Sequence, residues 1–263
     1  MDTNNADRIA RLRTFNVAAG FLHLGQAVVV LILTNGRSLP VMAAFGNGPP
    51  GQPSGPLVLE KLFSYRIGVA VFVFLALSAF FHFLVASPWG FPKYRGELIN
   101  TRNRFRWVEY SLSSTVMIVL IAGIVGMTDV VALLGIAGAN ASMIFFGWLM
   151  ETTNKPGPGV NWSPFRFGCF AGIIPWLGVA IYTVGAGQSN RGNGDGVPPF
   201  VYGIFVSLFL FFNCFAITQL KQYGAKGKWA DYLHGEWAYI ILSLVAKSAL
   251  AWQVFANVLL PDV

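Results

Sequence analysis

Apolar residues along this chain occur in long unbroken runs instead of the short alternating segments of a soluble protein. A helix rises about 1.5 Å per residue, so about 20 apolar residues cross a bilayer core about 30 Å thick. Seven runs approach or exceed this length without Asp, Glu, Lys or Arg, apart from one lysine in the last run. They are too long for membrane-barrel strands of about 10 residues. We therefore predict seven spanning helices, over residues 12–36, 62–87, 98–128, 130–151, 165–187, 197–222 and 232–260.

The composition supports a membrane protein with a single domain. Only 11% of the 263 residues are charged and 55% are hydrophobic, whereas soluble domains contain about 25% charged residues. The seven segments leave no room for a separate soluble domain, so residues 1–263 are expected to form one transmembrane domain. The predicted fold class is an all-α membrane protein, a bundle of seven helices.

Lysine and arginine are distributed unevenly between the two sides of the predicted bundle. With seven spans, the N-terminus and the loops after the second, fourth and sixth helices share one side. That side holds thirteen of these residues, and the other side holds four, Arg37, Lys61, Arg66 and Arg191. Because loops rich in Lys and Arg stay in the cytoplasm, we predict a multi-pass plasma-membrane protein with a cytoplasmic N-terminus and an extracellular C-terminus.

The net charge of +7 could attract nucleic acid or an anionic membrane surface. Since the positive charge is concentrated in loops on one side, we expect the lipid bilayer as partner and no nucleic acid. An unidentified cytoplasmic signalling partner is the alternative for the loop after the second helix, which carries Lys93, Arg95, Arg102, Arg104 and Arg106.

The connecting segments constrain the topology further. The stretch Gly46–Pro56 contains too much Gly and Pro for a helix, so this external loop is expected either to form a hairpin cap or to be mobile. A very short loop centred on Asp129 makes the third and fourth helices antiparallel neighbours. Cys169 and Cys214 lie in apolar runs without nearby metal ligands, which argues against a disulfide or a metal site.

Lys247 is the single charged residue within the last apolar run. It lies 16 residues after Asp231 and 15 before Asp262, which places it roughly 20 Å from either edge of the membrane. A lysine at this depth costs about 2.5–3.5 kcal/mol on insertion scales, and burial favours its neutral, nucleophilic amine. These properties are compatible with a covalent role, attachment of an aldehyde, and equally with a structural ion pair or a transport site.

Glu109 is the natural partner of Lys247, because it lies in the hydroxyl-rich segment RWVEYSLSS of the third helix. A carboxylate within about 4–6 Å would keep an imine protonated. The alternative is an ion pair with Arg106, one turn away. Ser243 and Ser113 lie one turn from Lys247 and Glu109 and could hydrogen-bond near the imine or bond helix carbonyls instead.

Further polar and aromatic residues are candidates for a buried pocket. His23 and His82 lie deep in the first and second helices, where they could form a proton store or be satisfied core histidines. A long apolar cavity with a few polar groups could be lined by Trp107, Tyr110, Ser114, Asn140, Met143, Trp176, Phe212 and Gln219, although such residues equally serve packing. Gly168 and Gly172 form a GxxxG pair that permits close helix contact, within the chain or in a dimer.

Three segments of this chain resemble heliorhodopsins, a family within the retinal-binding microbial rhodopsins. These are RWVEYSLSS (Arg106 to Ser114), NASMIFFGW (Asn140 to Trp148) and SLVAKSALAW (Ser243 to Trp252). The similarity extends through nearly all seven helices, and the N-terminus that charge counting places in the cytoplasm agrees with the inverted orientation of that family. The fold expected from the resemblance is a rhodopsin-like seven-helix bundle.

The resemblance implies all-trans retinal on Lys247 as a protonated Schiff base, with Glu109 as counterion and Ser243 as a hydrogen-bonding neighbour. It places His23 and His82 in a cytoplasmic-side polar cavity and implies a homodimer through the fourth and fifth helices. Light would isomerise the retinal to 13-cis, and the Schiff base would lose and regain its proton. The expected function is a light sensor, not an enzyme.

The main alternative is a light-driven proton pump or channel. Pumps of this fold carry carboxylates eleven residues after the counterion and four before the lysine, where this chain has Leu120 and Ser243. One obvious internal carboxylate remains, which favours sensing without sustained ion transport. A receptor or transporter that uses Lys247 without retinal is the other class, although no internal repeat supports an inverted-repeat transporter.

Overall fold

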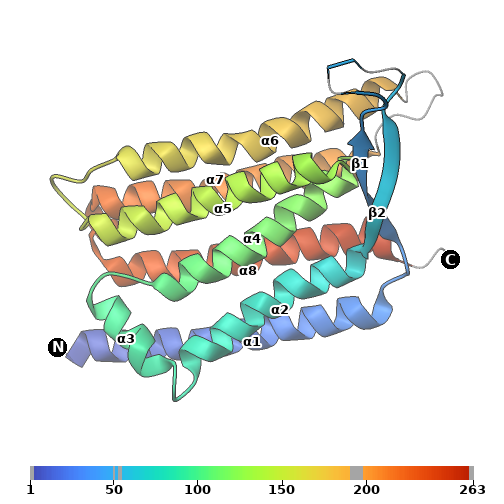
Figure 1. Ribbon diagram of the computed structural model, residues 1–263. Helices are drawn as coiled ribbons and strands as arrows, with labels where there is room; N and C mark the ends of the chain where they lie inside the picture. The colour runs from blue at the N-terminus through green and yellow to red at the C-terminus, as the bar shows by residue number, and fades with distance from the viewer. Residues whose placement is uncertain (1–2, 50, 53–54, 190–197, 261–263) are drawn as a thin grey trace.

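Seven long helices lie side by side in the computed structural model, which describes residues 3–49, 51–52, 55–189 and 198–260 (Figure 1). Each is long and apolar enough to cross a membrane. They are α1 (Thr3–Leu33), α2 (Ile67–Ala86), α4 (Arg104–Ile124), α5 (Val130–Thr153), α6 (Ser163–Ser189), α7 (Pro199–Gly224) and α8 (Tyr232–Val254), the last continued by a π-helical turn at Phe255–Leu259.

The structure differs from the expected boundaries at the starts of several spans. α1 begins at Thr3 instead of residue 12, and residues 62–66, expected to begin the second span, belong to strand β2 (Val58–Arg66). Residues 98 and 99, expected to begin the third span, instead end a separate short helix, α3 (Phe91–Ile99), which is followed by a break. Thr101 adopts a positive φ of 54°, and the side chain of Asn103 caps α4 by accepting a hydrogen bond from the backbone N–H of Arg106. The break and the cap therefore start α4 at Arg104. Residue 197, expected to begin the sixth span, lies outside the described residues, as does Arg191.

A β-hairpin covers one end of the bundle, which is one of the two outcomes left open for the first external loop (Figure 1). Strands β1 (Ser38–Phe45) and β2 (Val58–Arg66) pair antiparallel, with an irregularity between Val41 and Met42. Residues 50 and 53–54 of the Gly- and Pro-rich stretch lie outside the described residues. The backbone N–H of Met42 donates to the carbonyl of Thr128 (2.8 Å), so the hairpin is attached to the turn between α4 and α5.

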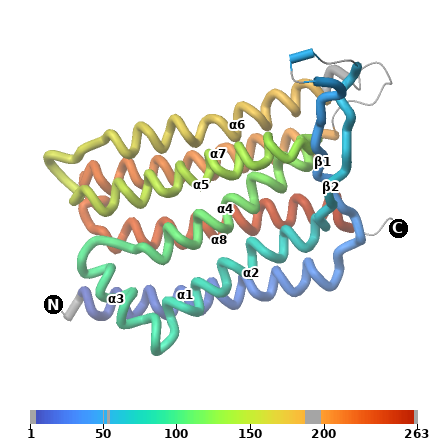
Figure 2. The backbone as a smooth tube through the Cα atoms, in the orientation of Figure 1, coloured from blue at the N-terminus to red at the C-terminus, as the bar shows by residue number. Residues whose placement is uncertain are grey.

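The backbone path gives the bundle two unlike ends, which we call the hairpin end and the basic end (Figure 2). The basic end holds the start of α1, the helix α3 and the connections from α5 to α6 and from α7 to α8, where the lysines and arginines are concentrated. α1 begins at the basic end and α8 finishes at the hairpin end, as an odd number of spans requires.

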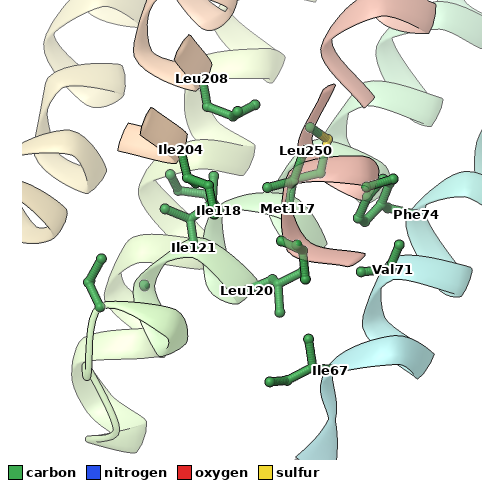
Figure 3. Packing of buried hydrophobic residues seen from close by; sticks show 14 of the residues in the cluster. Ile67, Val71, Phe74, Met117, Ile118, Leu120, Ile121, Ile204, Leu208 and Leu250 are labelled. Carbon is green, nitrogen blue, oxygen red and sulfur yellow. The ribbon is translucent and has the colours of Figure 1, made fainter. Parts of the chain in front are cut away.

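The hairpin half of the bundle contains a continuous apolar core (Figure 3). Side chains from α2, α4, α7 and α8 meet there, and ten are labelled in the figure: Ile67, Val71, Phe74, Met117, Ile118, Leu120, Ile121, Ile204, Leu208 and Leu250. The outer faces of the helices are also apolar, with Phe170 and Ile181 of α6 about 70% exposed (72% and 69%), as expected for surfaces in contact with lipid.

Candidate functional site

Lys247 and Glu109 form a buried ion pair between α8 and α4. The Lys247 Nζ lies 2.8 Å from Glu109 Oε1 and 2.7 Å from the hydroxyl of Ser243, one turn earlier on α8. The side chain of Lys247 is 4% exposed and that of Glu109 is 7% exposed. Removing one partner from such a buried pair costs about 3–5 kcal/mol, because an uncompensated charge is left behind.

Ser78 of α2 is a third member of this site that was not predicted from the sequence. Its Oγ donates to Glu109 Oε1 at 2.7 Å, so three helices meet at the carboxylate. The one sequence feature that could have identified Ser78 is its hydroxyl group, which lies in an otherwise apolar segment of the second span. Ser113, expected near the imine, lies in the same region, and its Oγ has no hydrogen-bond partner among the described residues.

A large apolar cavity extends from the Lys247 amine among α4, α5, α6 and α7. It encloses about 830 Å³ of empty space, including its open mouth, and an apolar wall with a few polar groups is typical of small-molecule sites. Its wall includes the predicted residues Trp107, Tyr110, Ser113, Ser114, Met143, Phe212, Gln219, Ser243 and Lys247.

Two predicted residues, Asn140 and Trp176, are not part of this wall. Asn140 Nδ2 donates to Ser114 Oγ (2.8 Å) and Thr115 Oγ1 (3.0 Å), so it lies behind the wall and holds α4 against α5. Trp176 packs edge-on against Phe212, at 5.3 Å between ring centroids.

Tyr239 is an aromatic wall residue that was not predicted from the sequence, as are Phe165 and Phe215. It lies eight residues before Lys247, so with Ser243 it continues the face of α8 that carries the lysine. The hydroxyl of Tyr110 donates to the Tyr239 carbonyl (3.0 Å), and the Lys247 Nζ lies 5.1 Å from the centre of the Tyr110 ring. The four-residue spacing of Tyr239, Ser243 and Lys247 is the sequence feature that could have identified Tyr239.

Glycines allow the cavity wall to close. A Cβ at Gly147 of α5 would collide with the Trp107 ring, and one at Gly168 of α6 would lie 3.3 Å from Phe146 Cβ. Gly172 faces Met143 of α5 in the same way. The GxxxG pair therefore serves helix contact within the chain, the intramolecular outcome left open by the sequence.

A second, smaller cavity lies on the basic side of Glu109. Its wall includes Asn16, Ser78, His82, Glu109, Glu236 and Ser243. His82 Nδ1 lies 2.7 Å from Asn16 Oδ1, and the His23 and His82 rings stack at 5.5 Å between centroids. His23 is fully buried, and neither ring nitrogen has a hydrogen-bond partner among the described residues. Burial also raises the pKa of Tyr94, which lines this cavity from α3.

The expectation of one internal carboxylate is corrected by a cluster at the basic end, which we call the Arg106 cluster. Arg106 pairs with Glu151 of α5 (2.8 Å) and with Glu236 of α8, not with Glu109. Both carboxylates are 1% exposed. Neither carboxylate could be recognised from the sequence, because each lies at the end of an apolar run, where only packing decides whether it contacts water or is buried.

Comparisons with known proteins agree with this architecture. The family model described as Heliorhodopsin matches residues 12–259, which is nearly the whole chain. The chain belongs to the heliorhodopsin family. This result confirms the predicted family, and with it a retinal-binding, light-sensitive membrane protein that is a photoreceptor and not an enzyme.

A solved structure gives the same fold at low sequence similarity. The crystal structure of Exiguobacterium sibiricum rhodopsin superposes with a TM-score of 0.62 over 94% of this chain and 96% of that one, at 13% identity. The match confirms the predicted rhodopsin-like bundle of this heliorhodopsin. No curated protein matches the chain.

Proposed function

We propose that this heliorhodopsin carries retinal on Lys247, with Glu109 as counterion, and senses light without sustained ion transport. One observation carries the proposal: the buried Lys247 amine, paired with Glu109, lies at the wall of the large apolar cavity. The residues fit retinal, because the apolar wall matches its polyene and burial favours the neutral Lys247 amine that condenses with its aldehyde. The proposal extends to the all-trans isomer as the form bound in the dark.

Retinal, when bound, supplies an aldehyde that condenses with an amine and a polyene whose shape changes in light. The residues around retinal have three roles. Lys247 supplies the amine, Glu109 balances the positive charge that remains at this nitrogen, and Ser78 and Ser243 hold the two groups in place. The Tyr110 ring, whose centre lies 5.1 Å from the Lys247 Nζ, covers the amine.

The apolar core supports sensing over pumping. On the hairpin side of Lys247, the path between the helices is filled by Met117, Leu120 and Leu250, which are at most 2% exposed. Buried charged side chains in the described part of the chain all belong to the Lys247–Glu109 pair or the Arg106 cluster. Beyond the pair, the buried charged groups of the described residues therefore lie only toward the basic end, and this asymmetry favours sensing over vectorial transport.

The orientation and the dimer also belong to this proposal. The excess of Lys and Arg at the basic end supports a cytoplasmic position for that end. A homodimer through α5 and α6 would use their outer apolar faces, since Gly168 and Gly172 are already in contact with α5 of the same chain. Cysteine crosslinking at Phe170, against Phe80 on α2 as control, tests this interface.

Reconstitution with retinal tests the central claim. We expect a coloured protein that hydroxylamine bleaches in the light, no colour in Lys247→Ala, and full colour in the matched variant Lys61→Ala on the exposed hairpin. Continuous illumination of voltage-clamped cells should produce no steady current. A colourless wild-type protein would remove the proposed chromophore, and a steady light-driven current would remove the sensing role in favour of a pump or channel.

A further inference from the structure

The Arg106 cluster joins three helices at the basic end through an unusually dense set of hydrogen bonds. Glu151 accepts from Arg106, from the Tyr232 hydroxyl (2.7 Å), from the Asn103 backbone N–H (3.0 Å) and from the Trp107 indole. Glu236 accepts from Arg106 and from the Asn103 amide (2.8 Å). The cluster thus ties α4 to both α5 and α8.

Two residues belong both to the large cavity and to the surroundings of this cluster. Trp107 lines the cavity with its ring and donates its indole N–H to Glu151. Tyr239 lines the cavity, and the Arg106 guanidinium carbon lies 4.0 Å from the centre of its ring. The same guanidinium lies 4.8 Å from the Trp107 ring centre. One layer of aromatic rings therefore separates the cavity from the cluster.

The Trp107 ring has little freedom to move away from the cluster. On its α5 side it contacts Gly147, where even a Cβ would collide with it. The Gly147 carbonyl is in turn bonded by Gln219 Nε2 of α7 at 2.9 Å, and Gln219 also lines the cavity. A change of shape inside the cavity that displaces this ring must therefore alter its hydrogen bond to Glu151.

The charge of the cluster makes it sensitive to such a change. Two carboxylates share one guanidinium, so the charged groups sum to −1 in a region of low dielectric, where each hydrogen bond to a carboxylate is stronger than in water. Glu151 has four donors and Glu236 has two. If the hydrogen bond from the Trp107 indole to Glu151 is weakened, Arg106 shifts and the hydrogen bonds are redistributed between Glu151 and Glu236.

We propose that Trp107 and Tyr239 couple the chromophore cavity to the Arg106 cluster, so that a change of chromophore shape alters the joint between α4, α5 and α8 at the basic end. This coupling rests on the proposed function, because it requires retinal in the large cavity. Glu151 acts as a positioning residue for Trp107, and the output is a change in how three helices are held together beside the basic loops.

Light-minus-dark infrared spectroscopy of the retinal-loaded protein tests the coupling. We expect carboxylate difference bands that disappear in part with Glu151→Gln and in part with Glu236→Gln. Trp107→Phe, which keeps a ring but removes the indole donor, should reduce the Glu151 band severalfold. The matched control is Glu97→Gln, because Glu97 pairs with Arg104 at the same end (2.5 Å) without lining the large cavity, and it should leave every band unchanged.

A second measurement does not depend on the folding of these variants. In wild-type protein labelled at the indole nitrogen of tryptophan, light should shift an N–H stretching band. A light-responsive pigment without carboxylate or indole bands, or with a Glu151 band that keeps its amplitude in Trp107→Phe, would overturn the coupling and leave the proposed function intact. A protein that forms no pigment would overturn the proposed function itself.

Discussion

The two halves of the bundle are built from the same helices but bury different kinds of side chain. Toward the hairpin end, α2, α4 and α8 contribute Val71, Leu120 and Leu250 to a core without charge. Toward the basic end, the same helices contribute Ser78, Glu109 and Glu236, which are buried and hydrogen-bonded. The boundary lies at Lys247, about four turns into α8.

This difference shows which contacts between membrane helices require particular partner residues. Apolar packing inside a bilayer gains little over contact with lipid tails, so the apolar half can seal the bundle without choosing a partner for each residue. The buried carboxylates at the basic end each need specific donors. Four variants can break or sharpen the comparison, beginning with the largest expected effect.

A carboxylate placed in the apolar core should be the most damaging change. Leu120→Glu would bury an acid with no donor, which we expect to cost more than the roughly 3–5 kcal/mol of a broken buried pair and to abolish folded protein. Leu120→Met, which conserves volume, should cost less than about 1.5 kcal/mol. Yield and melting temperature in detergent measure both, and a well-folded Leu120→Glu protein would contradict the contrast between the halves.

Removing the cation of the Arg106 cluster should be the next largest effect. Arg106→Gln leaves Glu151 and Glu236 facing each other, at a cost of about 3–5 kcal/mol. Adding Glu151→Gln and Glu236→Gln to this variant should recover much of the loss, because no unpaired charge then remains. Thermal unfolding of the single and triple variants checks this. Equal melting temperatures for the two would show that charge is not the cause.

Neutralising Glu109 should change the pigment more than the fold. In Glu109→Gln the positive nitrogen loses its balancing charge, so we expect absorption at longer wavelength. The proton should also leave at a pH lower by about 1–3 units, the range of such charge effects. A pH titration of the spectrum measures both, with Glu97→Gln as the unchanged control. An unaltered spectrum and titration would exclude Glu109 as the counterion.

A methyl group at Gly147 should give the smallest of these effects. Gly147→Ala would press on Trp107 and is expected to cost about 1–3 kcal/mol, the usual range for overpacking, with a small spectral shift. Gly138→Ala on the same helix meets nothing within 4 Å and should be neutral or slightly stabilising. Melting temperatures and absorption spectra of the two variants compare them directly. The same result for both would mean that Gly147 does not confine Trp107.

Some residues of the site could be predicted from the sequence, because their positions follow from the helical period and from the cost of burying charge in lipid. The depth of Lys247 and the polar segment around Glu109 suggested a pair that the structure places at 2.8 Å. Ser78 and Tyr239 were missed because their roles depend on which helix faces of different spans meet, and no local pattern records that.

By itself, the sequence determined the seven spans and the uneven distribution of charge, because hydrocarbon admits only long apolar helices and the loop charges can be counted. Only the tertiary structure decided that Arg106 binds Glu151 and Glu236, that Asn140 lies behind the cavity wall, and that the first external loop forms a hairpin. The physical reason is that a buried polar group is satisfied by whichever donors packing brings to it, and these come from residues as far apart in the chain as Arg106 and Glu236.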